Sequence, residues 1–140
     1  YNPSTQTLSV DNIDMTDGTL TTPELDDYSI SSTSVTPTGT TQTCTYSTSQ
    51  SYEIDLGSTT GNITITLSGG PPAGTYGEMI IKVTQHNTIN RTITWAGGTF
   101  EWPGGTAPTM STGADAIDIY HFSTWNGGTN WFGSAIQAMA

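Results

Sequence analysis

Aromatic side chains beside glycine turns are the residues of this sequence that could most readily recognise a ligand. The sequence contains four tryptophans: Trp95, Trp102, Trp125 and Trp131. An indole ring in such a position can stack on a sugar at the surface, or it can be buried at a corner of a small β-domain. Burial is favoured for most of them, but Trp125 directly precedes the turn residues Asn126-Gly127-Gly128 and is the most exposed by position. We therefore keep Trp125 and Trp102 as possible ligand contacts.

Histidine and cysteine do not form a recognisable catalytic or metal-binding pattern. His86 lies in a polar loop, whereas His121 shares a strand face with Ile117 and Ile119, which favours a buried core histidine. Cys44 stands between two threonines and is typical of a half-buried strand residue. Zinc sites need ligands at close, regular spacings, and these three residues do not provide them. The sequence predicts no catalytic residues, no metal site and no cofactor.

The sequence contains neither a calcium loop nor a serine-hydrolase motif. The segment DNIDMTDG, residues 11–18, resembles a calcium loop. Aligning Gly18 with the loop glycine puts Ile13 and Met15 where carboxylates are required. No G-x-S-x-G elbow for a serine hydrolase occurs anywhere in the chain. The interpretation is therefore a non-enzymatic protein.

Charge excludes two classes of partner. The chain carries 12 acidic residues against 2 lysines and arginines, for a formal charge of −10. Binding to nucleic acids or to anionic membrane surfaces requires cationic side chains that neutralise phosphates, so neither partner is expected. Half of the acidic residues fall within residues 1–27. A single cysteine also means that no disulfide can form within the chain.

The elements that must position these residues are strands. Threonine occurs 29 times, and its β-branched side chain suits a half-exposed sheet. Only the final SAIQAMA leaves room for a helix, and WNGGTN predicts a hairpin turn. We predict an all-β fold, an antiparallel β-sandwich or jelly roll of about 8–9 short strands. The expected strands are 28–35, 42–47, 51–57, 62–67, 77–85, 91–95, 116–124 and 130–136.

Alternation of apolar and polar residues within these strands predicts which side chains form the core. Of the tryptophans, Trp95 and Trp102 are also expected to pack, in a corner built by the glycines and prolines of WPGGTAP. The residues expected to be largely buried are Ile54, Leu56, Ile63, Ile65, Leu67, Ile80, Val83, Ile93, Ile119 and Trp131.

The N-terminal region differs from the rest of the chain. Residues 1–26 are expected to form an extended β arm that precedes a β-sandwich domain at 27–140. Apolar residues in the arm are too sparse to form a core within one chain, so they need the sandwich or further copies of the arm. A flexible acidic tether is the alternative. The residues assigned to assembly are Leu8, Val10, Ile13, Met15 and Leu20.

Several motifs together resemble the β-domain of fibre, head-decoration and related structural proteins of tailed bacteriophages. They are YNPST at the start, LDDYS at 25–29, YEIDLGSTTGNITITLSG at 52–69, RTITWAGGTFEWPGGTAPTMSTGADAIDIYHFST at 91–124, and WNGGTNWFGSAIQ. The resemblance covers nearly the whole chain and is densest after residue 91. It implies a non-enzymatic component on the outer surface of a phage particle, usually a homotrimer docked to other virion proteins. Such domains often carry more lysine than this chain.

The sequence thus leaves two hypotheses from different classes. The first is a phage structural protein, either a fibre segment or a capsid or tail decoration module, which acts through self-assembly. The second is a carbohydrate-binding module that recognises a host surface glycan through exposed tryptophans such as Trp125 and Trp102.

Overall fold

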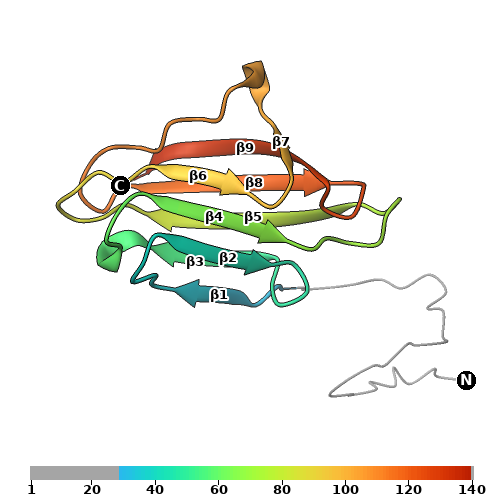
Figure 1. The fold of residues 1–140 in the computed structure, drawn as a ribbon, viewed down its shortest axis with the longest axis horizontal. Coiled ribbons are helices and arrows are strands. Elements are labelled where there is room, and N and C mark those ends of the chain that lie inside the picture. The colour runs from blue at the N-terminus through green and yellow to red at the C-terminus, as the bar shows by residue number, and fades with distance from the viewer. Residues whose placement is uncertain (1–28, 140) are drawn as a thin grey trace, which may run out of the picture.

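The computed structural model describes residues 29–139, which fold into nine strands and two short 3-10 turns (Figure 1). This confirms the all-β class. The strands are β1 (Ser32–Val35), β2 (Thr41–Thr45), β3 (Ser51–Asp55), β4 (Ile63–Ser68), β5 (Gly77–Thr84), β6 (Ile93–Ala96), β7 (Thr99–Glu101), β8 (Ile117–Thr124) and β9 (Asn130–Met139). The turns are η1 (Leu56–Ser58) and η2 (Pro103–Gly105).

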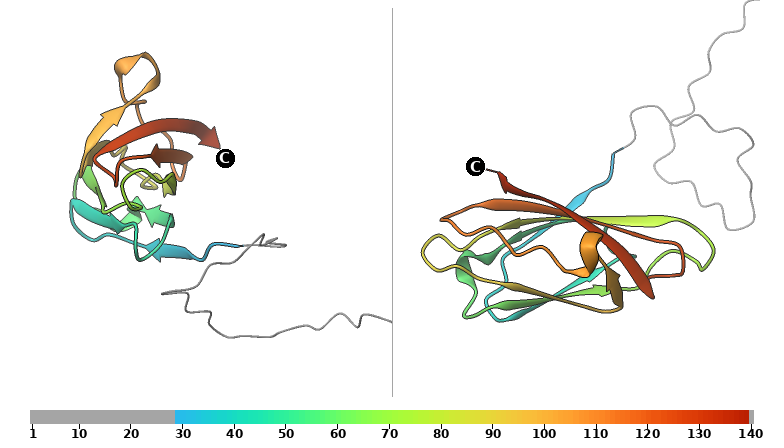
Figure 2. Two further views of the ribbon diagram at one scale, coloured as in Figure 1. Left: turned by 90° about the vertical axis from the view of Figure 1, so that its right-hand side faces the viewer. Right: turned by 90° about the horizontal axis from the view of Figure 1, so that it is seen from above.

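The first six strands alternate between two sheets. One sheet has six strands in the order β1-β3-β5-β8-β9-β7, and the other has three in the order β2-β4-β6. The end-on view in Figure 2 (left) shows the chain passing from one sheet to the other after each of these strands. Successive strands of one sheet therefore run in the same direction, as the parallel pairs β1–β3, β3–β5, β2–β4 and β4–β6 demonstrate.

The predicted antiparallel arrangement is wrong for most of the molecule. Five of the seven strand pairs are parallel, and only β5–β8 and β8–β9 are antiparallel. Hairpin turns join antiparallel neighbours, whereas parallel neighbours need a crossover. For the four parallel pairs among β1 to β6, this crossover is a strand of the other sheet. The turn WNGGTN does form the predicted hairpin between β8 and β9. Sequence reasoning missed β7, and residues 134–139 belong to β9 rather than to a helix.

One core lies between the two sheets. In β4 the residues Ile63, Ile65 and Leu67 point inward and the intervening polar residues point outward, as the alternation predicts. Ile54, Leu56, Val83 and Trp131 are buried as expected, together with those three. The rest of the core cluster is Cys44, Tyr52, Met79, Ile81, Met110, Tyr120 and Phe122.

The phase of two strands differs from the prediction. Ile80 on β5 is 43% exposed, because Met79 and Ile81 occupy the inward positions on either side of it. On β8 the inward residues are Asp118, Tyr120, Phe122 and Thr124, so Ile119 and His121 face outward and are only half-buried. A shift of one residue exchanges the two faces of a strand. Ile93 on β6 is half-buried and packs against the core.

The WPGGTAP segment forms a corner over the core, as predicted. The backbone N–H of Gly105 donates to the carbonyl of Trp102 at 2.8 Å, and Gly104 and Gly105 both have a φ of 76°. The half-buried Trp102 ring lies against Phe122 with 5.5 Å between ring centroids. It also covers Gly133, where an added Cβ would lie 2.5 Å from the indole. The corner thus depends on a glycine in β9.

Candidate functional site

The outward side of the six-stranded sheet is the candidate interaction surface, and we call it the outer face. The solvent side of a sheet is ordinarily polar, but this one carries the exposed side chains of Ile80, Phe132 and Ile136 among polar residues. Ile119 stands directly opposite Ile136 on β9, and Ile80 is opposite His121. Ile136 is 64% exposed, the highest value among the large hydrophobic side chains of residues 29–139. The residues of the outer face include Ser51, Glu53, Asp55, Glu78, Ile80, Lys82, Ile119, His121, Ser123, Phe132, Ser134 and Ile136.

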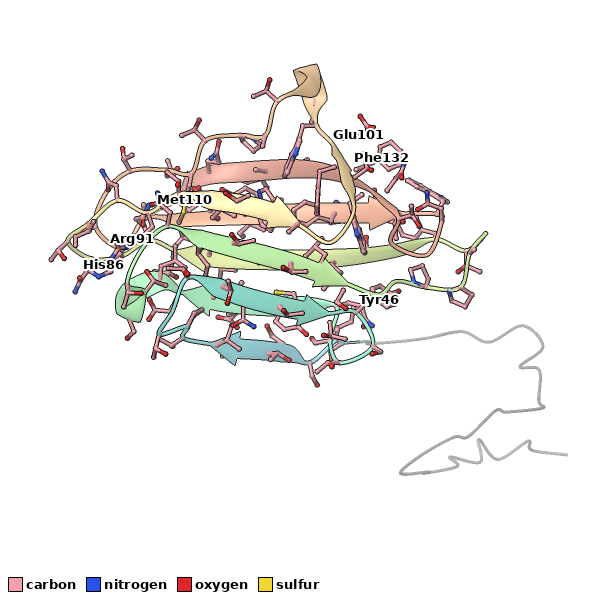
Figure 3. All side chains as sticks on the ribbon, viewed as in Figure 1. Tyr46, His86, Arg91, Glu101, Met110 and Phe132 are labelled. Carbon is pink, nitrogen blue, oxygen red and sulfur yellow. The ribbon has the colours of Figure 1, made fainter. Side chains whose placement is uncertain are left out.

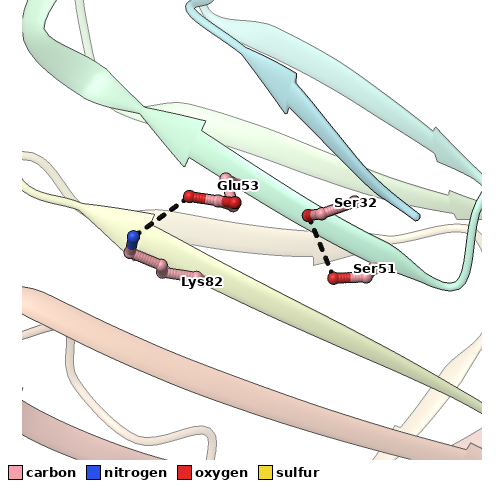
Figure 4. A network of polar contacts seen from close by, with 4 residues as sticks. All are labelled: Ser32, Ser51, Glu53 and Lys82. Carbon is pink, nitrogen blue, oxygen red and sulfur yellow. Dashed lines mark hydrogen bonds and ion pairs between the residues drawn. The ribbon is translucent and has the colours of Figure 1, made fainter. Parts of the chain in front are cut away.

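The acidic side chains of the outer face have partners. Lys82 Nζ lies 3.0 Å from Glu53 Oε2, next to the hydrogen-bonded serines Ser32 and Ser51 (Figure 4). An exposed pair of this kind stabilises a fold by no more than about 1 kcal/mol, so its main effect here is to balance charge. Glu78 Oε2 lies 3.0 Å from His121 Nε2. Both Glu53 and Glu78 therefore have a side-chain partner on the outer face, and Lys82 balances one of these two carboxylates.

A shallow hollow lies on the outer face beside the point where the described chain begins. It has a volume of about 290 Å³ and is lined by Ile30, Gln50, Ser51, Glu78 and Ile80. Ile30 is 41% exposed and lies just before β1. Residues 1–28, which include the assembly residues Leu8, Val10, Ile13, Met15 and Leu20, lie outside the described residues.

Three exposed aromatic rings gather at one end of the molecule, and we call Tyr76, Trp125 and Phe132 the end patch. Their exposed fractions are 51%, 52% and 47%. Ring centroids are 5.1 Å apart for Tyr76 and Trp125 and 5.7 Å apart for Trp125 and Phe132. Figure 3 places Phe132 at the end opposite His86 and Arg91. Within residues 29–139, every aromatic side chain classed as exposed belongs to this patch.

The β8–β9 hairpin turn holds Trp125 in place. Thr124 Oγ1 accepts hydrogen bonds from the N–H groups of Asn126 and Gly128 and donates to Asn126 Oδ1. Asn126 Oδ1 also accepts from the N–H of Asn130 at 2.9 Å, so the side chains close the turn from within. The loop before β5 is tied to the same turn, because Gly74 N–H donates to the Trp125 carbonyl at 3.0 Å.

Glu78 supplies a carboxylate beside the end patch. Its Oε2 accepts a hydrogen bond from Tyr76 Oη at 2.8 Å and contacts His121. Hydrogen bonding from His121 and then from Tyr76 lowers the pKa of Glu78, against the opposing effect of burial. The same hydrogen bond from the phenol to Glu78 raises the pKa of Tyr76. Both side chains therefore keep their usual charge states at neutral pH, ionised for Glu78 and neutral for Tyr76.

The structure separates the predicted tryptophans. Trp131 is fully buried, and Trp95 and Trp102 pack against the core, as expected. One side of Trp102 lines a shallow hollow with Pro103, Pro108, Ser134 and Ala135 among its neighbours. Trp125 is the exposed tryptophan of the described chain, also as expected from its place beside the turn.

Sequence reasoning missed Tyr76 and Phe132. A signal for Phe132 was present, because adjacent residues in a strand point to opposite faces and its neighbour Trp131 was assigned to the core. No comparable signal identifies Tyr76. Its position depends on the loop before β5 meeting a turn that is distant in sequence.

The remaining residues that could do chemistry, His86 and Cys44, have structural roles. His86 Nδ1 accepts hydrogen bonds from the N–H groups of Thr88 and Ile89, which organises the loop that contains it. Cys44 is buried, and this burial raises the pKa of its thiol to about 12. Among residues 29–139, no group of three or more histidine, cysteine or acidic side chains is placed to hold a metal ion.

Comparison with known proteins does not assign this chain to a family. No family model, no curated protein and no solved structure matches this chain. In the part of the chain that the structure describes, no helix has the length and hydrophobicity needed to cross a membrane.

Proposed function

We propose that this chain is a non-enzymatic structural component of a phage virion, a fibre segment or a capsid or tail decoration module on the outer surface of the particle. It acts by assembling into a homotrimer and docking to other virion proteins. The observation that supports this most is the outer face, on which Ile80, Ile119 and Ile136 form an apolar strip across β5, β8 and β9, with Ile80 and Ile136 exposed among residues 29–139. Exposed apolar surface of this kind is typical of interaction sites.

Charge favours the outer face over other surfaces as the contact between copies. Each chain has a formal charge of −10, so copies repel one another. Repulsion is least where carboxylates already have cationic or hydrogen-bonding partners, and Glu53 and Glu78 have such partners in Lys82 and His121. Closed cyclic symmetry would bury the same strip on every copy.

The arm and the two sheets have separate parts in this proposal. Residues 1–26 add contacts between copies through Leu8, Val10, Ile13, Met15 and Leu20, and residues 27–140 form the domain. We also propose that the two sheets pack face to face as a β-sandwich, which their shared core supports. The parallel pairing of strands among β1 to β6 distinguishes this proposed sandwich from an antiparallel jelly roll.

Substitutions on the two surfaces test the proposal. A buried, unpaired carboxylate opposes association strongly, so Ile136→Asp in the full chain is expected to give monomers in light scattering. Ile13→Asp is expected to weaken the trimer. On dilution, this variant is expected to dissociate at a protein concentration at which the unmodified chain is still trimeric. Ile89→Asp is the matched control, because Ile89 is 51% exposed in a loop outside the outer face. If Ile136→Asp and Ile89→Asp have the same oligomeric mass as the unmodified chain, the outer face is not the interface.

A further inference from the structure

The end patch is a second feature that packing in the core does not explain, and two of its three rings, Tyr76 and Trp125, lie outside the strands of the outer face. Other aromatic rings of residues 29–139 pack inside, as Trp95 does against Tyr120 and Phe122. Tyr76, Trp125 and Phe132 instead keep about half of their surface in water. Leaving three large rings in water is unfavourable, and a patch of this kind commonly marks a binding site.

The geometry of the rings restricts what could bind. Tyr76 and Trp125 are inclined by 58° to each other, and Trp125 and Phe132 by 72°. Rings at such angles cannot lie together on one flat surface such as the face of a crystalline polysaccharide. They can form a cradle in which one sugar ring stacks on a single indole while the other two rings contact its edges. The C–H groups on a sugar face are slightly positive and suit the negative face of an aromatic ring.

A polar group stands at the edge of the cradle. Both hydrogen-bonding contacts of Glu78 among the described residues use Oε2, which leaves Oε1 able to accept from a ligand hydroxyl. A hydrogen bond to an ionised carboxylate is stronger than one between neutral groups. A combination of apolar rings with one fixed acceptor is typical of small-ligand sites, in which the polar group sets the orientation.

We propose that the end patch is a binding site for a neutral saccharide, with one sugar ring stacked on Trp125 and a hydroxyl donated to Glu78. The negative charge of Glu78, and of the chain as a whole, selects against anionic sugars. The hydrogen bonds of Thr124 and Asn126 fix the backbone of the turn before any ligand arrives, which lowers the entropic cost of binding.

Titration calorimetry with the full chain tests the proposal. The probes are soluble hexasaccharides of neutral sugars, namely cellohexaose, laminarihexaose, maltohexaose, mannohexaose and N-acetylchitohexaose, with sialyllactose as an anionic comparison. At least one neutral probe is expected to bind. Trp125→Ala is expected to weaken that binding by about tenfold or more, and Glu78→Gln by about threefold. Phe132→Ser is a second variant of the cradle, and Ile89→Ala is the control that leaves affinity unchanged.

Three outcomes of the titrations count against the site. The proposal is overturned if no neutral probe binds, if sialyllactose binds best, or if Trp125→Ala binds as well as the unmodified chain. Light scattering on Trp125→Ala separates this proposal from assembly. A loss of oligomeric mass without any saccharide binding would assign the end patch to contacts between copies. A monomeric chain that binds saccharide would instead leave this site standing and contradict the trimer.

Discussion

Asp118 and Gln85 are polar side chains that the fold buries completely, and both are satisfied by backbone groups. Gln85 donates to the carbonyls of Arg91 and Ser111 and accepts from the N–H groups of His86 and Arg91. Asp118 accepts from the N–H groups of Ser111 at 2.8 Å and Ala138 at 3.0 Å. These two residues fasten the long segment between β7 and β8, and the end of β9, to the core.

Asp118 is expected to make stability depend on pH. Burial alone would raise its pKa, but hydrogen bonds from Ser111, Ala138 and Gln137 outweigh burial and lower it. A carboxylate with a lowered pKa stabilises the fold above its unfolded value of about 3.9, and this contribution is lost as the pH falls through the folded value. Asp118→Asn is expected to cost about 2 kcal/mol at pH 7.

Urea unfolding of the unmodified chain and of Asp118→Asn, repeated from pH 7 to pH 3, measures this contribution. The difference in unfolding free energy between them is expected to shrink as the pH falls below about 4, because the variant has no carboxylate at this position to protonate. A difference that stays constant over this range would mean that Asp118 is not ionised in the folded protein.

Strand positions could be predicted from the sequence, but strand partners could not. Alternation identified β3 and β4 together with their buried faces, because each of these strands has one clear apolar set. β8 has isoleucines on one face and Tyr120 and Phe122 on the other, so alternation alone does not decide which face is inward. Only the position of β8 between β5 and β9 decides it. The parallel pairing likewise depends on crossovers that no local signal encodes.

The candidate site, like the fold, could be predicted only in part from the sequence. Trp125 was found from its place beside the hairpin turn, since turn residues lie at the surface. The outer face was missed, because an apolar residue such as Ile80 or Ile119 is ordinarily assigned to the core of its own chain. An interface between copies uses the same residue types as a core, so one sequence cannot distinguish the two.

The packing of the WPGGTAP corner on β9 can be tested by its effect on stability. Gly133→Ala places a methyl group where the Trp102 ring lies, and overpacking of this kind costs about 1–3 kcal/mol. Ser134→Ala is the control, because Ser134 is the exposed neighbour of Gly133 on the same strand. Urea denaturation is expected to show a lower midpoint for Gly133→Ala alone. Equal midpoints would mean that Trp102 does not close the corner through this contact.

The molecule as a whole presents two surfaces, to which we assign the two proposed uses. The outer face carries the Lys82–Glu53 and His121–Glu78 pairs together with isoleucines, while three exposed aromatic rings gather at one end of the molecule. In a trimer built on the outer face, the strip around Ile136 would be covered, and saccharide binding additionally requires that Phe132 and Glu78 of the same face stay accessible. Half of the acidic residues belong to residues 1–27, so lower salt is expected to weaken any association of the arms by removing screening.

The mass of the full-length chain in solution is the most direct test of assembly. Sedimentation equilibrium at physiological salt, over a wide range of protein concentration, gives this mass independently of shape. A homotrimer predicts three times the 14.8 kDa of a single chain. A mass of 14.8 kDa at every concentration would show that the outer face does not join copies and would contradict the proposed structural role.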